Sequence, residues 1–246
     1  MLPWTERHRP AMLGDVHGND DVIRALLSFK TMAAMPNFIL HGPPGSGKNS
    51  SILAMGREFL GVEGMSTMVL ELNAGDVRCV ETMRNQIHYF TICFSVTQTA
   101  GNAIKLVVLD ESDTLIYHAQ CAVRHLIETS SGHARFFLCC NYVNKLSAGL
   151  RSRCTSFRFS GLGKAQLYRT VQAVAEKEEY QLSRYGLDAV VDVCSCDARQ
   201  AINLLQSLSL GDATTAANSG DGNAVYESCG LPSPCEIGFI FNALIN

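Results

Sequence analysis

The chain has 246 residues, of which 47% are hydrophobic and 17% charged, and its formal net charge is −3. This composition is typical of a globular protein with enough apolar material for a core, in one large or two modest domains. The small negative charge excludes a chain coated in positive charge for nucleic acid, so any such contact must come from a local patch.

Neither a membrane span nor a disulfide framework is predicted. No apolar run approaches the ~20 residues that cross a bilayer, and the first four residues lead directly into charged ones rather than into a signal-peptide core. We therefore expect an intracellular protein. The ten cysteines show no paired C-x-x-C spacing and lie mostly in apolar segments, which favours buried, reduced thiols over disulfides or a zinc site.

The N-terminal part combines a polar segment, residues 4–10, with a helix that begins near Asn19 or Asp20. Either residue is a suitable helix cap. The apolar positions of this helix are Val22, Ile23, Leu26 and Leu27. From the residues alone, this part is an arm that packs on the core.

A glycine-rich loop follows the apolar run at residues 38–40 and has the spacing G-x-x-x-x-G-K. In such a loop, glycines let backbone N–H groups turn inward around phosphate oxygens, and the lysine reaches the β- and γ-phosphates. A helix from about residue 48 adds its positive dipole end. We predict nucleotide binding by Gly42, Pro43, Pro44, Gly45, Ser46, Gly47, Lys48, Asn49 and Ser50. A plain turn between strand and helix is disfavoured because a second nucleotide motif follows.

One position of the loop departs from the usual pattern. Asn49 stands where a Ser or Thr hydroxyl normally binds Mg²⁺, and Ser50 is one residue out of register. An amide oxygen can ligate magnesium, but it lacks the geometry of a hydroxyl. Nucleotide binding is therefore predicted, and hydrolysis at this site stays open.

The next predicted elements are a strand at residues 67–72 and an amphipathic helix at residues 77–90. Arg78 and Arg84 lie on the polar face of that helix. From periodicity alone, two such arginines indicate a solvated face.

A buried strand at residues 106–109 ends in Asp110 and Glu111. Four apolar residues before two carboxylates form the Walker B arrangement. We expect Asp110 to hold magnesium, directly or through water, and Glu111 to orient and deprotonate the attacking water. In isolation, an acidic strand end is often only a helix cap, but the phosphate loop upstream favours the metal site.

Two further side chains are candidates for the same site. After a helix at residues 119–127, the strand at residues 135–140 ends at Asn141, where an amide would lie near the γ-phosphate and water. An Asx turn is the alternative for this residue. Arg153 has the fixed fork of donors that stabilises transferring phosphate oxygens, although a surface arginine paired with a carboxylate is also compatible with the sequence.

The C-terminal third changes character. After a last strand at residues 155–159, we predict helices at about residues 164–179, 184–193 and 197–208, and a flexible loop at residues 211–223.

Several segments, taken in order, resemble the small ATPase subunits of replication factor C, the eukaryotic sliding-clamp loader of the AAA+ family. They are W-x-E-x-x-R-P from Trp4, L-x-D-V-x-G from Leu13, the phosphate loop, ELNAGDVR from Glu71, the Walker B carboxylates, CNYVNKL from Cys140, SRC at residues 152–154 and DARQAINLLQ from Asp197. The resemblance extends from Leu2 to about Glu236.

The resemblance assigns further roles to named residues. It implies that Arg9, Pro10 and Val16 lie near the adenine base, and that Asn141 is sensor 1. It also implies that Arg199 is the sensor 2 residue, contacting the phosphates from a lid.

Other implied roles concern partners. Arg153 would be an arginine finger that reaches the nucleotide of a neighbouring subunit. Arg78, Arg84 and Lys145 would hold DNA phosphates in the central channel.

The implied fold is α/β, an AAA+ P-loop NTPase domain with a parallel sheet flanked by helices at residues 1–160. A small three-helix lid follows at residues 161–210, and residues 211–246 hold a flexible loop and the start of a collar domain that is otherwise missing or truncated. The implied cofactors are ATP and Mg²⁺.

The implied function is to load the sliding clamp PCNA onto primer–template DNA in the nucleus, independently of sequence, as part of a hetero-pentamer with other replication factor C subunits. Three alternatives stay open: a hydrolysis-poor regulatory subunit that donates Arg153 to a neighbour, a different AAA+ machine such as a helicase loader or an unfoldase, and a non-enzymatic scaffold.

Overall fold

The computed structural model describes residues 2–75, 80–92, 104–212 and 222–245. The chain forms two compact units, one made of Pro10–Ser160 and the other of Met1–Arg9 with Gly161–Asn246. The first nine residues, which we assigned to the nucleotide-binding domain, therefore group with the C-terminal helices.

The first unit alternates strands and helices along the chain. Its strands are β1 (Phe38–His41), β2 (Val69–Asn73), β3 (Lys105–Asp110), β4 (Ala134–Cys140) and β5 (Thr155–Arg158). Its α-helices are α2 (Asp20–Leu27), α3 (Lys48–Met68), α4 (Val80–Ile92), α5 (Tyr117–Thr129) and α6 (Ala148–Arg151). Short 3₁₀ turns are η1 (Leu13–Asp15), η2 (Met32–Ala34), η3 (Ser112–Thr114) and η4 (Val143–Lys145).

The five strands form one sheet in the order β2-β3-β4-β1-β5, and every pairing is parallel. The carboxyl ends of the strands therefore lie along one edge, which is where open α/β sheets bind ligands. The phosphate loop follows β1, Asp110 ends β3, and Asn141 follows β4. This topology brings three segments far apart in sequence to the same edge.

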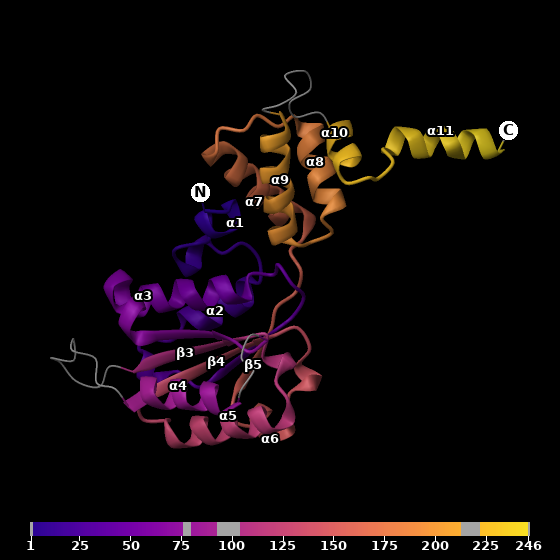
Figure 1. Ribbon diagram of the computed structural model, residues 1–246. Helices are drawn as coiled ribbons and strands as arrows, with labels where there is room; N and C mark the ends of the chain where they lie inside the picture. The colour runs from indigo at the N-terminus through magenta and orange to yellow at the C-terminus, as the bar shows by residue number, and fades with distance from the viewer. Residues whose placement is uncertain (1, 76–79, 93–103, 213–221, 246) are drawn as a thin grey trace. The chain divides into compact units, whose positions relative to one another are not determined.

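Helices cover both faces of the sheet, with α2 and α3 on one side and α4, α5 and α6 on the other (Figure 1). Alternate strand residues serve the two layers. Leu106 and Val108 pack with Ile52 of α3, whereas Val107 and Leu109 pack with Val123 of α5. Because both faces are buried, the central strands are continuous apolar runs, as the sequence analysis inferred.

The predicted α/β class with a parallel sheet flanked by helices is confirmed, and the differences lie at element ends. The expected strand at residues 67–72 begins two residues later, because α3 continues to Met68. That helix is interrupted at Gly61, whose φ of 69° and ψ of 173° are not helical. In the expected helix at residues 77–90, residues 77–79 lie outside the described part and α4 begins at Val80.

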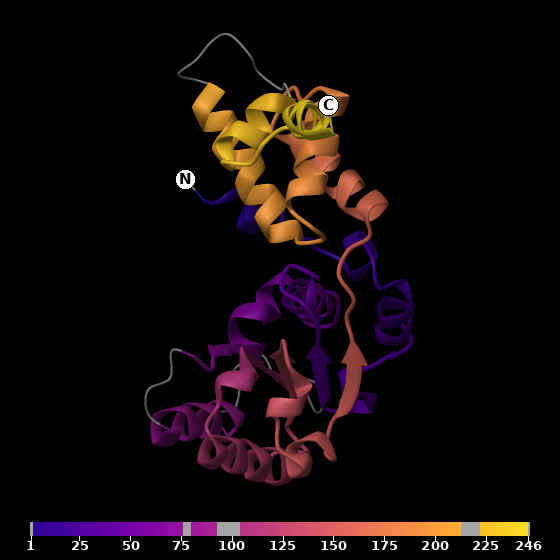
Figure 2. The same ribbon diagram turned by 90° about the vertical axis from the view of Figure 1, so that its right-hand side faces the viewer.

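The second unit is helical (Figures 1 and 2), and its buried apolar side chains form a core of their own. It contains α1 (Trp4–Arg7), α7 (Lys164–Lys177), α8 (Arg184–Val193), α9 (Ala198–Asp212), α10 (Gly222–Ser228) and α11 (Pro234–Ile245). Trp4 is buried against this core, and its backbone N–H donates to Gln206 Oε1 at 3.0 Å. Arg7 Nη1 and His8 Nε2 contact the Glu178 carboxylate at 2.7 and 2.5 Å. These contacts attach the N-terminal arm to α7 and α9.

Part of the loop expected at residues 211–223 lies outside the described residues, while α9 extends to Asp212 and α10 begins at Gly222. Among the described helices, none is both long and apolar enough to span a membrane. The eight described cysteines are free thiols. Cys139, Cys140 and Cys194 are buried, whereas Cys196 and Cys235 are exposed, and burial raises the pKa of Cys140 and of Cys194 to about 12. The buried cysteines are therefore protonated, unreactive core residues.

Candidate nucleotide-binding site

The phosphate loop has a backbone that only glycine permits at its first position. Gly42 has a φ of +154°, and a Cβ built on it would lie 2.0 Å from the backbone oxygen of Phe159. The N–H of Phe159 donates to the His41 oxygen at 2.7 Å, so the end of β5 holds the loop entrance. Gly45 and Gly47 also have positive φ, 66° and 89°, as a loop with inward N–H groups requires.

Lys48 links the loop to the tip of β4. Its Nζ donates to the oxygens of Gly42 and Pro43, both at 2.8 Å, and to Asn141 Oδ1 at 3.3 Å. The predicted pair of Lys48 and Asn141 is therefore brought together. An ammonium held over the loop by carbonyl and amide oxygens can exchange these partners for phosphate oxygens.

Asn49 and the Walker B carboxylate are also in contact, but not as a magnesium site requires. Asn49 Nδ2 donates to Asp110 Oδ2 at 2.7 Å, and Asp110 Oδ1 accepts the Glu111 backbone N–H at 2.9 Å. Mg²⁺ takes oxygen ligands, and the group that Asn49 directs at Asp110 is a nitrogen. These two side chains, as arranged, do not fit the predicted metal site.

Glu111 follows in a left-handed conformation with a φ of 51° and is exposed. A Cβ built on Gly75 would lie 2.9 Å from Glu111 Oε2. The glutamate therefore lies beside the end of β2, and a side chain at position 75 would crowd it. The catalytic role of Glu111 stays a prediction.

His41, the last residue of β1, lies in a positive environment. Burial, and then the charges of Arg158 and Lys48, lower the pKa of His41 below its ordinary value of 6.5. A neutral imidazole beside two cations leaves the positive charge of this edge to Lys48 and Arg158, and a positive edge suits an anionic ligand.

Parts of the arm reach the loop within the first unit. Val16 Cγ1 would lie 3.6 Å from a Cβ built on Gly47, and the Pro10 oxygen accepts from Arg57 Nη1 of α3 at 3.2 Å. Val16 is thus placed against the loop, and Pro10 against the helix that follows it. Arg9 belongs to the other unit, where its Nη2 donates to Glu6 Oε1 at 2.8 Å.

Asn19 has a role that the sequence analysis missed. It precedes α2, but its side chain makes no capping bond. Instead, Asn19 Nδ2 donates to the oxygens of Ser46 and Ser160 at 3.5 and 3.2 Å, and its Oδ1 accepts the Ser160 backbone N–H at 2.8 Å. It therefore ties the phosphate loop to the end of the first unit. The only local signal in the sequence is the residue type, since Asn tolerates the left-handed φ of 56° that it adopts here better than most residues do.

Arg153 is paired with a carboxylate of its own chain. Its Nε lies 2.5 Å from Glu128 Oε1 at the end of α5, and the side chains are 38% and 42% exposed. Its Nη1 also donates to the Gly149 oxygen at 2.8 Å. This contact matches the alternative left open by the sequence, and it leaves the side chain accessible to another chain.

The remaining predicted residues are the basic ones assigned to DNA and to the lid. Arg84 on α4 and Lys145 on η4 are exposed, and Lys145 Nζ lies 5.2 Å from the centre of the Tyr142 ring. Arg78 lies outside the described residues. Arg199 is exposed on the first turn of α9, in the other unit, where its backbone N–H donates to Asp197 Oδ1 at 2.9 Å.

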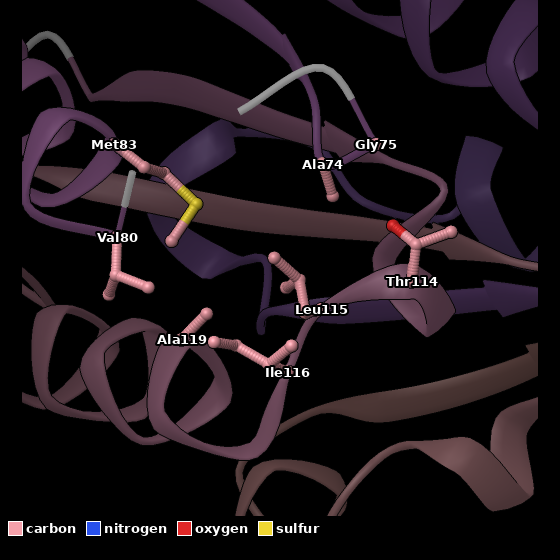
Figure 3. Close-up of a pocket in the computed structure, with 8 residues that line it drawn as sticks. All are labelled: Ala74, Gly75, Val80, Met83, Thr114, Leu115, Ile116 and Ala119. Atoms are coloured by element: carbon pink, nitrogen blue, oxygen red, sulfur yellow. The ribbon is translucent and has the colours of Figure 1, made fainter. Parts of the chain in front are cut away.

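A separate hollow of about 200 Å³ lies between the start of α4, the end of β2 and the turn before α5. Figure 3 shows the side chains of Met83 and Leu115 pointing into it. Its lining consists of Ala74, Gly75, Val80, Met83, Thr114, Leu115, Ile116 and Ala119. Because none of these side chains is charged, the hollow is not suited to a nucleotide phosphate.

Comparison with known proteins identifies a family and individual relatives. Residues 38–162 match the family described as "ATPase family associated with various cellular activities (AAA)". The chain is 36% identical to replication factor C subunit 3 of Saccharomyces cerevisiae over 244 residues, covering 99% of this chain and 71% of that protein. It is 35% identical to replication factor C subunit 5 of Homo sapiens over 246 residues, covering 100% of this chain and 70% of the human protein.

Among solved structures, the fold is similar to RuvB of Thermotoga maritima, a Holliday junction branch migration motor. The TM-score is 0.70 at 16% sequence identity, and the match covers 89% of this chain and 71% of the RuvB chain. At this identity the likeness concerns the fold alone.

Proposed function

This chain belongs to the replication factor C subunits of the AAA family of ATPases, and from that membership we propose that it is a nucleotide-binding subunit of a clamp loader. In the proposed hetero-pentamer with other replication factor C subunits, ATP binding promotes opening of the sliding clamp PCNA and grip on primer–template DNA. ATP hydrolysis in the assembly then releases both. The proposed location is the nucleus, where DNA is replicated and repaired.

The observation that carries this proposal is the contact of Lys48 Nζ with Asn141 Oδ1 at 3.3 Å above the phosphate loop. Two residues 93 positions apart meet where the γ-phosphate of ATP would lie in a P-loop protein. We propose that Lys48 binds the β- and γ-phosphates, that Asn141 orients the attacking water, and that Glu111 accepts its proton. Val16 and Pro10, with Arg9, are proposed to enclose the base.

The proposal also assigns roles to basic residues that contact the neighbouring subunit, the lid side of the nucleotide and DNA. Arg153 acts on the nucleotide of the adjacent subunit, and Arg199 contacts phosphate from the lid. Arg78, Arg84 and Lys145 bind DNA phosphates, a contact that carries no sequence information.

The nucleotide part is tested by Lys48→Ala in the reconstituted complex, with exposed Lys30→Ala as the matched control. Loss of a charge-assisted contact costs roughly 2–3 kcal/mol, so we expect ATP to bind about 30–150-fold more weakly. Clamp loading on primed DNA is expected to fall with it. Unchanged ATP affinity at this subunit would overturn the proposal.

The DNA part is tested by Arg84→Ala and Lys145→Ala, measured as DNA affinity over a range of salt concentrations. Each substitution is expected to weaken binding equally on all sequences and to reduce the salt slope by about one. Arg151→Ala, an exposed arginine on α6 with no proposed DNA contact, is the control.

A second candidate function, a hydrolysis-poor subunit that binds nucleotide and serves its neighbour, is favoured by the bond between Asn49 and Asp110. The test compares wild type with Asn49→Thr while the neighbouring sites are inactivated. Turnover only after the threonine is restored would support this candidate. Equal turnover would exclude it and leave an ordinary ATPase site.

A further inference from the structure

Both oxygens of the carboxylate that should face a divalent cation already accept a hydrogen bond from a neutral donor. Asp110 Oδ2 accepts the Asn49 amide at 2.7 Å, and Asp110 Oδ1 accepts the Glu111 N–H at 2.9 Å. Each oxygen of this carboxylate therefore already has a hydrogen-bond partner within the chain.

The amide differs from a hydroxyl because its hydrogen-bond donor and its lone-pair acceptor are on different atoms. A hydroxyl oxygen donates its proton to the aspartate and keeps lone pairs on the same atom for a metal. In Asn49 the donor is Nδ2, which has no lone pair for a metal, and the acceptor is Oδ1 on the other side of the amide. Oδ1 lies 4.0 Å from Cys139 Sγ, so it is directed at the buried end of β4. Mg²⁺ demands near-ideal octahedral oxygen coordination, which this arrangement does not offer.

The groups that hold phosphate do not depend on this position. Lys48 Nζ lies over the loop through the Gly42 and Pro43 oxygens. The loop glycines at 45 and 47 have positive φ, and α3 begins at Lys48, so backbone N–H groups and the helix dipole favour an anion there. Arg158, which pairs in register with His41 on the neighbouring strand β5, adds positive charge at the same edge.

We infer that this site binds adenine nucleotide as the metal-free polyanion, with an affinity that depends little on divalent cation. The inference deepens the proposed function and rests on its nucleotide-binding part. The Asn49 amide gives Asp110 Oδ2 a hydrogen-bond donor where a cation would otherwise stand.

The test is a titration of the complete chain with fluorescent ATP and ADP analogues, in excess MgCl₂ and in excess EDTA. For wild type we expect the ATP affinity to differ by less than about threefold between the two buffers. For Asn49→Thr we expect magnesium to tighten ATP binding by about tenfold or more, the size typical of restoring a metal-site group. Exposed Asn144→Thr is the matched control and is expected to behave as wild type.

A second readout is independent of turnover. Mn²⁺, a magnesium substitute detected by its electron paramagnetic resonance signal, is expected to be immobilised by the ATP-loaded Asn49→Thr chain and not by ATP-loaded wild type. A wild-type affinity for ATP that magnesium tightens by about tenfold or more would overturn the inference, whether or not the threonine variant folds. Absence of binding by wild type in both buffers would instead overturn the proposed nucleotide function.

Discussion

At the scale of single residues, Gly42 is the position where one added carbon has the clearest consequence. Its Cβ would lie 2.0 Å from the Phe159 oxygen, so Gly42→Ala must move the loop or the end of β5. We expect a loss of about 1–3 kcal/mol in unfolding free energy and weaker nucleotide binding, measured by urea unfolding and by titration. Gly14→Ala is the control, because no atom lies within 4 Å of its Cβ position. Equal stability of the two variants would contradict the prediction.

His41 makes the same edge sensitive to pH. Its pKa in the folded chain is lowered by burial and by Arg158 and Lys48. The unfolded chain therefore binds the proton more readily, and the unfolding free energy falls as pH drops from above 6.5 through the folded pKa. Arg158→Gln removes one lowering charge, so we expect NMR titration of the imidazole to give a higher pKa. Arg151→Gln should leave it unchanged, and an identical shift in both variants would show that Arg158 is not the cause.

Between elements, Gln120 joins the turns that follow β3 and β4. From α5, the buried Gln120 donates through Nε2 to the Leu115 and Lys145 oxygens at 3.0 and 3.1 Å. It also accepts the Ser147 N–H at 2.7 Å. Gln120→Ala would leave buried backbone groups unpaired, so we expect a loss of about 2–3 kcal/mol in urea unfolding. Gln172→Ala, in an exposed pair with Glu176, should cost little.

The ion pair between Glu128 of α5 and Arg153, which follows α6, restrains the arginine side chain. Both side chains are about 40% exposed, so Glu128→Gln is expected to change the unfolding free energy by less than about 1 kcal/mol. If Arg153 serves a neighbour, as proposed, the freed arginine should raise ATP turnover at the adjacent site of the reconstituted complex. Asp192→Asn, which breaks the exposed pair with Lys164, is the control. A fall in turnover would show that Glu128 orients the arginine rather than restrains it.

The sequence predicted the elements whose pattern is local and missed those that depend on distant partners. The buried strands could be predicted because they are apolar runs. Such a run predicted β4 and placed Asn141 at its end. The attachment of the N-terminal arm to the helical unit could not be predicted, because the partner of Trp4 is Gln206, 202 positions away. The orientation of the Asn49 amide could not be predicted either, since it depends on Asp110 at the end of β3 and Cys139 in β4.

For the whole molecule, the placement of the arm has a consequence that is directly measurable. The chain has a single tryptophan, and Trp4 is buried in the helical unit, so its fluorescence reports the unfolding of that unit. Fully buried valines offer a matched pair, Val171 on α7 in the helical unit and Val123 on α5 in the first unit. Each Val→Ala substitution should lower the unfolding free energy of the unit that contains it by about 2 kcal/mol.

We expect Val171→Ala to lower the urea midpoint of the tryptophan signal and Val123→Ala to leave that midpoint near the wild-type value. Val123→Ala should instead lower the midpoint reported by a nucleotide analogue bound to the first unit. The reason is that two units with separate cores can unfold independently. A tryptophan midpoint lowered equally by both substitutions would show that the units unfold together, and one lowered only by Val123→Ala would contradict the placement of Trp4.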